Sequence, residues 1–91
     1  FEEVQMRAVR VPEWSRALGQ TLAQIAPAQA FGVQIAGVNR GGVRILNPGA
    51  EEKLQAGDEV LTLGTGDQLD EFRTWLRERP GEDVADSSVE I

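Results

Sequence analysis

The residue types that most often carry out acid–base, nucleophilic or metal chemistry are almost missing from this chain. It contains no histidine, no cysteine and no tyrosine, and Lys53 is its single lysine. Histidine is the usual general base and metal ligand, and cysteine supplies thiolate nucleophiles, disulfides and zinc or iron–sulfur ligands. We therefore predict that the chain is not an enzyme and that it holds no metal ion.

One glycine-containing turn has some features of a phosphate-binding loop. Gly64-Thr65-Gly66 lies between a predicted strand and a predicted helix, and the N-terminus of a helix attracts anions. The turn lacks the third glycine of a dinucleotide-binding loop and the Gly-Lys-Ser/Thr of a P-loop. Asp67 and Asp70 would also repel a phosphate there. We therefore interpret this segment as a capped turn from strand to helix.

The arginines beside a predicted hairpin turn are the strongest candidates for anion recognition. Arg40 and Arg44 flank a Gly-Gly pair, and a guanidinium group binds phosphate or carboxylate oxygens through two parallel hydrogen bonds. Arginines at such a turn also serve as solvated surface residues, so both interpretations stay open. The acidic pairs 51–52 and 58–59 would form a cation site only if they faced one another, and turn solvation explains them without that.

Length and charge limit the class of protein further. A chain of 91 residues predicts one small domain, and a domain of this size buries only roughly 60–65% of the surface that it exposes when unfolded. Nine basic residues stand against 15 acidic ones, a net charge of −6, so we predict no nucleic-acid partner. The longest apolar run is far shorter than the ~20 residues of a membrane-spanning helix, and no signal peptide is evident. The chain begins with Phe1 and not Met, so we interpret it as a piece of a longer protein.

Alternation of apolar and polar residues predicts four strands. They span residues 4–11, 31–39, 43–46 and 59–63. The residues that we expect to point inward are Val4, Met6 and Ala8 in the first strand and Phe31, Val33 and Ile35 in the second. A tight turn over residues 40–42 joins the second and third strands into a hairpin.

Helical spacing and capping residues predict two helices. The first spans about 20–26 and is expected to end at Pro27. The second is expected to begin with Asp67 as its N-cap and to end before Pro80. The resulting order is β-α-β-β-β-α, which is an α+β fold with a small, largely antiparallel sheet.

Two features stand apart from the predicted sheet and helices. Residues 80–91 are acidic and lack hydrophobic periodicity, so we predict a disordered tail that follows a domain over residues 1–79. The acidic residues of this tail are Glu82, Asp83, Asp86 and Glu90. Trp14 is one of two tryptophans in a small domain, and we expect it at a surface that meets a partner.

Several short motifs follow one another in an informative order. They are Leu18-Gly19-Gln20-Thr21-Leu22, Phe31-Gly32-Val33-Gln34-Ile35, Asn39-Arg40-Gly41-Gly42, Asn47-Pro48-Gly49, Leu54-Gln55-Ala56-Gly57-Asp58 and Leu63-Gly64. No single motif is specific, but the ordered set resembles the TrkA-C domain over about residues 4–76. This domain is the C-terminal lobe of the RCK modules that regulate bacterial potassium transport. The forms Arg-Gly-Gly, Asn-Pro-Gly and Leu-Gln-Ala-Gly-Asp are most similar to the cytosolic tails of monovalent cation:proton antiporters.

This resemblance implies a non-catalytic, cytoplasmic regulatory domain of an inner-membrane transporter for K⁺ or Na⁺. TrkA-C domains pair as homodimers, and several bind a small ligand at the dimer interface, notably cyclic di-AMP. The implied partners are a second copy and a membrane-embedded transporter domain, on the same chain or on another. An alternative within the family is the C-terminal lobe of a separate gating subunit of a potassium uptake system or channel.

The resemblance places a ligand site at Gln34, Ile35, Arg40, Asn47 and Pro48. The chain departs from the cyclic di-AMP binders of the family, which carry an arginine shortly before the Phe-Gly pair and an asparagine soon after it. Ala28 and Gln34 stand at these two positions. Losing the arginine removes a charge-assisted phosphate contact, typically worth ~1.5–3 kcal/mol. Three alternatives stay open: a cyclic dinucleotide or other nucleotide, a different effector, or a domain that only dimerises.

A second resemblance leads to a different function. Residues 31–35 together with residues 54–61 are similar to a PDZ domain, in which a carboxylate-binding loop precedes a strand and peptide C-termini add to a sheet edge. A PDZ domain should close with a strand after its last helix, whereas Pro80 and the acidic tail follow here. The Gly19-Gln20-Thr21-Leu22 segment also has no counterpart in that fold. We keep a PDZ-like peptide-binding module as the alternative.

Overall fold

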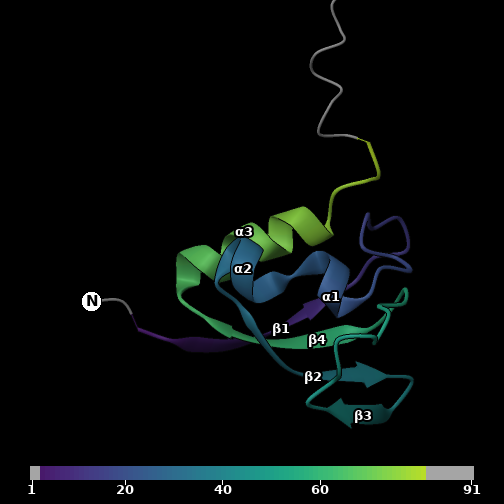
Figure 1. The fold of residues 1–91 in the computed structure, drawn as a ribbon, viewed down its shortest axis with the longest axis horizontal. Coiled ribbons are helices and arrows are strands. Elements are labelled where there is room, and N and C mark those ends of the chain that lie inside the picture. Colours follow the sequence, from purple (N-terminus) through teal and green to yellow (C-terminus); the bar gives the residue numbers. More distant parts are fainter. Residues whose placement is uncertain (1–2, 82–91) are drawn as a thin grey trace, which may run out of the picture.

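The computed structural model describes residues 3–81, and these form one sheet with helices on one side (Figure 1). The described elements are β1 (Gln5–Arg10), α1 (Leu22–Ile25), α2 (Pro27–Phe31), β2 (Gln34–Arg40), β3 (Val43–Leu46), β4 (Glu59–Gly64) and α3 (Gly66–Leu76). The four strands are antiparallel to their neighbours in the order β1-β4-β2-β3. The predicted α+β class is confirmed, and the elements follow one another along the chain as predicted, except that a second short helix precedes β2. Of the predicted acidic tail, residues 82–91 lie outside the described residues.

The helix-covered face of the sheet holds the core. Val9, Val38 and Val60 are almost fully buried there, beneath Leu69 and Phe72 of α3. Phe31 joins this core through an edge-to-face contact with Phe72, at 5.3 Å between ring centroids. The twelve buried apolar residues of this core are Val9, Val11, Ala17, Leu22, Ile25, Val33, Val38, Leu54, Val60, Leu69, Phe72 and Leu76.

The predicted inward face of the first strand is wrong. Val4 is 69% exposed and Met6 64%, and Ala8 is exposed too, whereas Val9 points into the core. Successive side chains of a strand point to opposite faces, so choosing the wrong alternate residue reverses the whole strand. The core-facing side is fixed by Val9 and by Arg7, whose guanidinium donates to Asp70 of α3 at 2.7 Å.

The opposite face of the sheet carries no helix in the described part of the chain. Cross-strand pairs place Met6 opposite Leu63 and Ala8 opposite Leu61 on this open face. At the far edge, Leu46 is 67% exposed. An antiparallel sheet that turns one face to water normally alternates apolar and polar residues so that the wet face is polar. On this open face the rows around Met6, Leu61 and Leu46 are instead apolar, and a polar row at one end consists of Arg10, Glu59, Asn39 and Arg44.

The predicted first helix is present but shorter, and a second short helix follows it directly. Thr21 caps α1: its hydroxyl accepts from the Gln24 amide at 3.1 Å, and its own amide donates to the Gln24 side chain at 2.9 Å. Ala26 then adopts the left-handed conformation, at φ 51°. Pro27 starts α2, where we expected it to end a helix. Proline suits the first turn of a helix because the backbone N–H that it lacks would have no hydrogen-bond partner within the helix there. Phe31 therefore belongs to α2, and β2 starts at Gln34, three residues later than expected.

The N-cap of the last helix lies two residues earlier than predicted. Thr65 is the N-cap of α3, and its hydroxyl accepts from the Gln68 amide at 3.3 Å. The Gln68 side chain in turn accepts from the Thr65 amide at 2.9 Å. Asp67, the predicted cap, lies in the first turn, where its charge complements the positive end of the helix. The interpretation of Gly64-Thr65-Gly66 as a capped turn is confirmed.

Candidate functional site

A cavity of about 630 Å³ opens between α1, α2, the start of β2 and the segment after β3. Three of the five predicted site residues, Gln34, Ile35 and Pro48, lie in its wall. The described residues that line it are Leu22, Ala23, Ala26, Pro27, Ala28, Gln29, Val33, Gln34, Ile35, Pro48, Gly49 and Ala50. Of the other two predicted residues, Asn47 lies next to this wall and Arg40 lies away from it.

The described lining of this cavity is mostly apolar and uncharged. Apolar side chains such as Ile35 and Pro48 form most of the described wall, and Gln29 and Gln34 supply amide donors and acceptors. None of the described lining residues carries a charge. An apolar wall with a few polar groups is typical of sites for small molecules that contain rings. The lining offers neither a general base nor a nucleophile.

The backbone is strained on both sides of the cavity. Ala26 at φ 51° and Asn47 at φ 47° are the two non-glycine residues with positive φ in the described chain. Ala26 lines the cavity, and Asn47 directly precedes Pro48 and donates its amide to the Ala36 carbonyl at 3.2 Å. A left-handed alanine costs free energy and persists only where its surroundings hold it. The packing of the two short helices and the turn after β3 therefore holds these two residues in this conformation.

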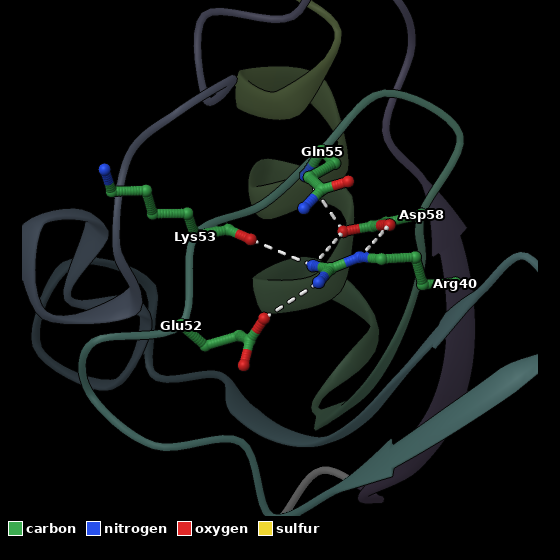
Figure 2. A network of polar contacts seen from close by, with 5 residues as sticks. All are labelled: Arg40, Glu52, Lys53, Gln55 and Asp58. Carbon is green, nitrogen blue, oxygen red and sulfur yellow. Dashed lines mark hydrogen bonds and ion pairs between the residues drawn. The ribbon is translucent and has the colours of Figure 1, made fainter.

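Arg40 holds the loop that follows the cavity (Figure 2). Its Nε and Nη2 atoms donate to the two carboxylate oxygens of Asp58 at 3.0 and 2.9 Å, and Nη1 donates to Glu52 at 3.0 Å. Nη2 also donates to the Lys53 carbonyl at 2.9 Å. Asp58 is 1% exposed, and its Oδ2 also accepts from the Gln55 amide at 2.9 Å. We call Arg40, Glu52 and Asp58 the loop clamp.

This clamp decides what Arg40 does. Hydrogen bonds and attraction from Asp58, followed by those from Glu52, raise the pKa of Arg40 above its ordinary value in spite of some burial. All three guanidinium nitrogens have acceptors within the chain. Arg40, which we predicted as a binder of anions, therefore already binds the carboxylates of Asp58 and Glu52. Arg44, on the other side of the hairpin turn, donates to Asn39 at 3.2 Å. Of the acidic pairs 51–52 and 58–59, Glu52 and Asp58 bind the Arg40 guanidinium and not a metal ion. Residues 3–81 contain no group of side chains able to hold a metal ion.

Backbone hydrogen bonds tie the same loop to the first helix. The amides of Leu22 and Ala23 donate to the carbonyls of Glu52 and Ala50 at 3.0 and 2.9 Å. Leu54 donates to the Gln20 carbonyl at 3.1 Å. Main-chain hydrogen bonds thus join the α1 wall of the cavity to the wall formed by the loop after β3.

Sequence reasoning missed much of the cavity wall. Leu22, Ala26 and Pro27 lie in it because α1 and α2 meet at a bend. The available signal was Pro27, which can start a helix as well as end one. It also missed the pairing of Asp58, a buried acid whose partner lies 18 residues away.

Among the helices of residues 3–81, none has the length and apolar character that a membrane span requires.

Comparisons with known proteins give this fold a family. The model of the TrkA-C domain matches residues 6–77. The RCK_C domain dimer of Streptococcus agalactiae BusR, solved with c-di-AMP, superposes at a TM-score of 0.74 with 22% identity, over 78% of this chain and 93% of that one. The RCK C domain of the potassium transport protein KtrA, also solved with c-di-AMP, gives 0.73 and 22%, over 79% and 82%.

Larger relatives contain the same fold as one part. The RCK domain of GsuK matches at a TM-score of 0.66 with 19% identity, and the match covers 80% of this chain but 16% of that one. BusR bound to its busAB promoter DNA is covered over 35% of its length. No curated protein sequence matches the chain. The family model covers most of the sequence, in the order and over the span that the motifs indicate, and the chain belongs to the TrkA-C domain family.

Proposed function

We propose that this domain is a cytoplasmic regulatory module of a monovalent cation transporter, and that it binds a small effector in the cavity between α1, α2 and β2. The cavity itself carries the proposal, because it brings Gln34, Ile35 and Pro48 together from separate segments. Two relatives of the same fold, BusR and KtrA, are solved with c-di-AMP. TrkA-C domains are typically regulatory and not catalytic.

Cyclic di-AMP is the first effector to test, although the described cavity wall supplies no charge for its phosphates. The apolar wall and the two glutamine amides suit a purine ring better than a phosphate. Charge from a second copy would therefore have to complete a cyclic dinucleotide site. A symmetric ligand on a two-fold axis would meet the same residues from each copy.

The proposed partner is a second copy of the chain, held through the open face of the sheet. Met6, Leu46 and Leu63 lie on this face without a helix over them. Large exposed apolar patches of this kind usually mark an interface. The BusR relative is solved as a dimer. Two copies that meet through this face would bury apolar surface that each alone leaves in water.

The transporter that we propose is a cation:proton antiporter, since the Arg-Gly-Gly, Asn-Pro-Gly and Leu-Gln-Ala-Gly-Asp forms resemble antiporter tails. The KtrA likeness supports the alternative, a gating subunit of potassium uptake. Expression of the full-length protein in everted membrane vesicles separates the two. Cation-driven proton exchange supports the antiporter, whereas potassium uptake that needs a second membrane protein supports the alternative.

Calorimetric titration of the purified domain tests the ligand. We expect micromolar binding of cyclic di-AMP at one molecule per two chains, with AMP and ATP as controls. A dimer that binds none of the three would contradict the nucleotide part of the proposal and leave a domain that couples subunits.

A further inference from the structure

The loop after β1 presents an ordered aromatic side chain to solvent. Trp14 is 43% exposed, and its indole nitrogen donates a long hydrogen bond, 3.4 Å, to the Arg77 carbonyl. The guanidinium carbon of Arg79 lies 5.1 Å from the centre of the Trp14 ring. A tryptophan held in this way loses little freedom when it binds, which is why exposed tryptophans are common at the centres of interfaces.

The surface around Trp14 is hollowed on two sides. One cavity, of about 240 Å³, is lined by Arg10, Pro12, Glu13, Trp14 and Arg77. The other, of about 350 Å³, includes Trp14, Arg79 and Pro80. We call Arg10, Trp14, Arg77 and Arg79 the tryptophan patch. It has three arginines, on a chain whose net charge is −6, and Glu13 is the one acidic residue among the described residues that line the two cavities.

The chain itself contains a segment of the opposite charge, which follows Arg79, Pro80 and Gly81 in the sequence. Residues 82–91 follow directly on Pro80 and Gly81, and Pro80 lines one of the two cavities. The segment has four acidic residues, no basic residue and three large apolar ones. The charged members are Glu82, Asp83, Asp86 and Glu90, and the apolar ones are Val84, Val89 and Ile91.

We propose that residues 82–91 bind the tryptophan patch of the same chain, so that any other acidic partner of that patch must displace them. Carboxylates of the segment pair with Arg10 and Arg77, and an apolar side chain enters a hollow beside Trp14. Ten residues reach at most roughly 33–36 Å when extended. A short tether also keeps the effective concentration of the segment in the millimolar range, so a weak contact is sufficient.

The indole N–H signals of the two tryptophans in a ¹H–¹⁵N NMR spectrum test this proposal in the whole chain. Trp14→Phe assigns the signals, and Trp75, which packs against Phe31 within the core, serves as the internal reference. We expect the variant E82Q/D83N/D86N/E90Q to shift the Trp14 signal at low salt and leave that of Trp75 in place. Salt at 1 M should move the parent signal toward that of the variant, because the Debye length falls to about 3 Å.

Two further variants make the result specific. R10Q/R77Q removes two charges of the tryptophan patch. When E82Q/D83N/D86N/E90Q is added to R10Q/R77Q, the Trp14 indole signal should no longer shift. The control E3Q/E51Q neutralises two acids elsewhere and should have no effect. An unchanged Trp14 signal in E82Q/D83N/D86N/E90Q overturns the proposal, as does a shift that survives in R10Q/R77Q. A difference between the parent and E82Q/D83N/D86N/E90Q signals that disappears on tenfold dilution shows binding between chains and also overturns it.

Discussion

Arg40 and Asp58 meet side by side, with Nε and Nη2 of the guanidinium 3.0 and 2.9 Å from the two oxygens of a carboxylate that is 1% exposed. This pair joins the end of β2 to the turn before β4. Its bidentate geometry is the strongest form of the arginine–carboxylate contact. The pair therefore stabilises the loop that carries Pro48 and Ala50 to the cavity.

Replacing Arg40 should be the most damaging change to the loop clamp. Arg40→Met leaves the buried Asp58 carboxylate without its cation, and we expect the free energy of unfolding to fall by about 3 kcal/mol. Urea unfolding followed by circular dichroism measures this loss. Glu52→Gln is the matched control: Glu52 is more exposed than Asp58, so its pair should contribute about 1 kcal/mol or less. Equal losses in the two variants would contradict this role for Asp58.

Relieving the bend between α1 and α2 should stabilise the domain. Ala26 at φ 51° carries a left-handed penalty of about 1–2 kcal/mol. Ala26→Gly removes that penalty at an entropic cost of about 0.5–1 kcal/mol, so we expect a small rise in Tm. Ala30→Gly, inside α2, has no such strain to relieve and should lower Tm. A lower Tm for Ala26→Gly would show that the bend is not strained.

An arginine at position 28 should create affinity for phosphate. Ala28 is exposed on α2 and lines the cavity. A charge-assisted hydrogen bond of about 1.5–3 kcal/mol corresponds to a gain of about ten- to a hundredfold in affinity. We expect Ala28→Arg to gain this for cyclic di-AMP in a calorimetric titration. Ala30→Arg is the control, because Ala30 is exposed on the same helix and is not among the residues lining the cavity. A similar gain in affinity in both variants would reflect non-specific attraction between the added positive charge and the phosphates, and would contradict a phosphate contact at position 28.

A charge on the open face should separate the proposed dimer. Met6→Lys places an ammonium group among the apolar side chains of this face, and we expect the dimer dissociation constant to rise at least tenfold in sedimentation equilibrium. Met6 is 64% exposed in the single chain, so folding should change by less than about 0.5 kcal/mol. Thr74→Lys, on the exposed side of α3, is the control. Dimers that tolerate Met6→Lys would place the interface elsewhere.

The sequence predicts the succession of strands along the chain well, but not which face of each strand is buried. Val33 is buried as predicted, and the Gly-Gly turn joins β2 to β3. In β1 the apolar residues occur on both faces, so alternation alone chose Met6 over Val9. The contact that settles the face, Arg7 with Asp70, spans 63 residues and has no local signal.

Three of the five predicted ligand-site residues line the cavity, and the other two do not. Gln34, Ile35 and Pro48 follow from motif order, and the family match removes the PDZ-like alternative. Arg40 was expected to face a ligand because its type suits anions. Its actual partner Asp58 lies in a different motif, and local patterning cannot pair two motifs across a fold.

The fastening between the two walls of the cavity has a mechanical consequence. The Leu22, Ala23 and Leu54 amides bond across the gap, and the loop clamp holds the far end of the same loop. Opening the cavity would break several of these hydrogen bonds at once. We therefore expect each chain to move as a rigid body when a ligand binds. The displacement that reaches a transporter would then arise as a rotation between two rigid copies, and its size would depend on the distance from their axis.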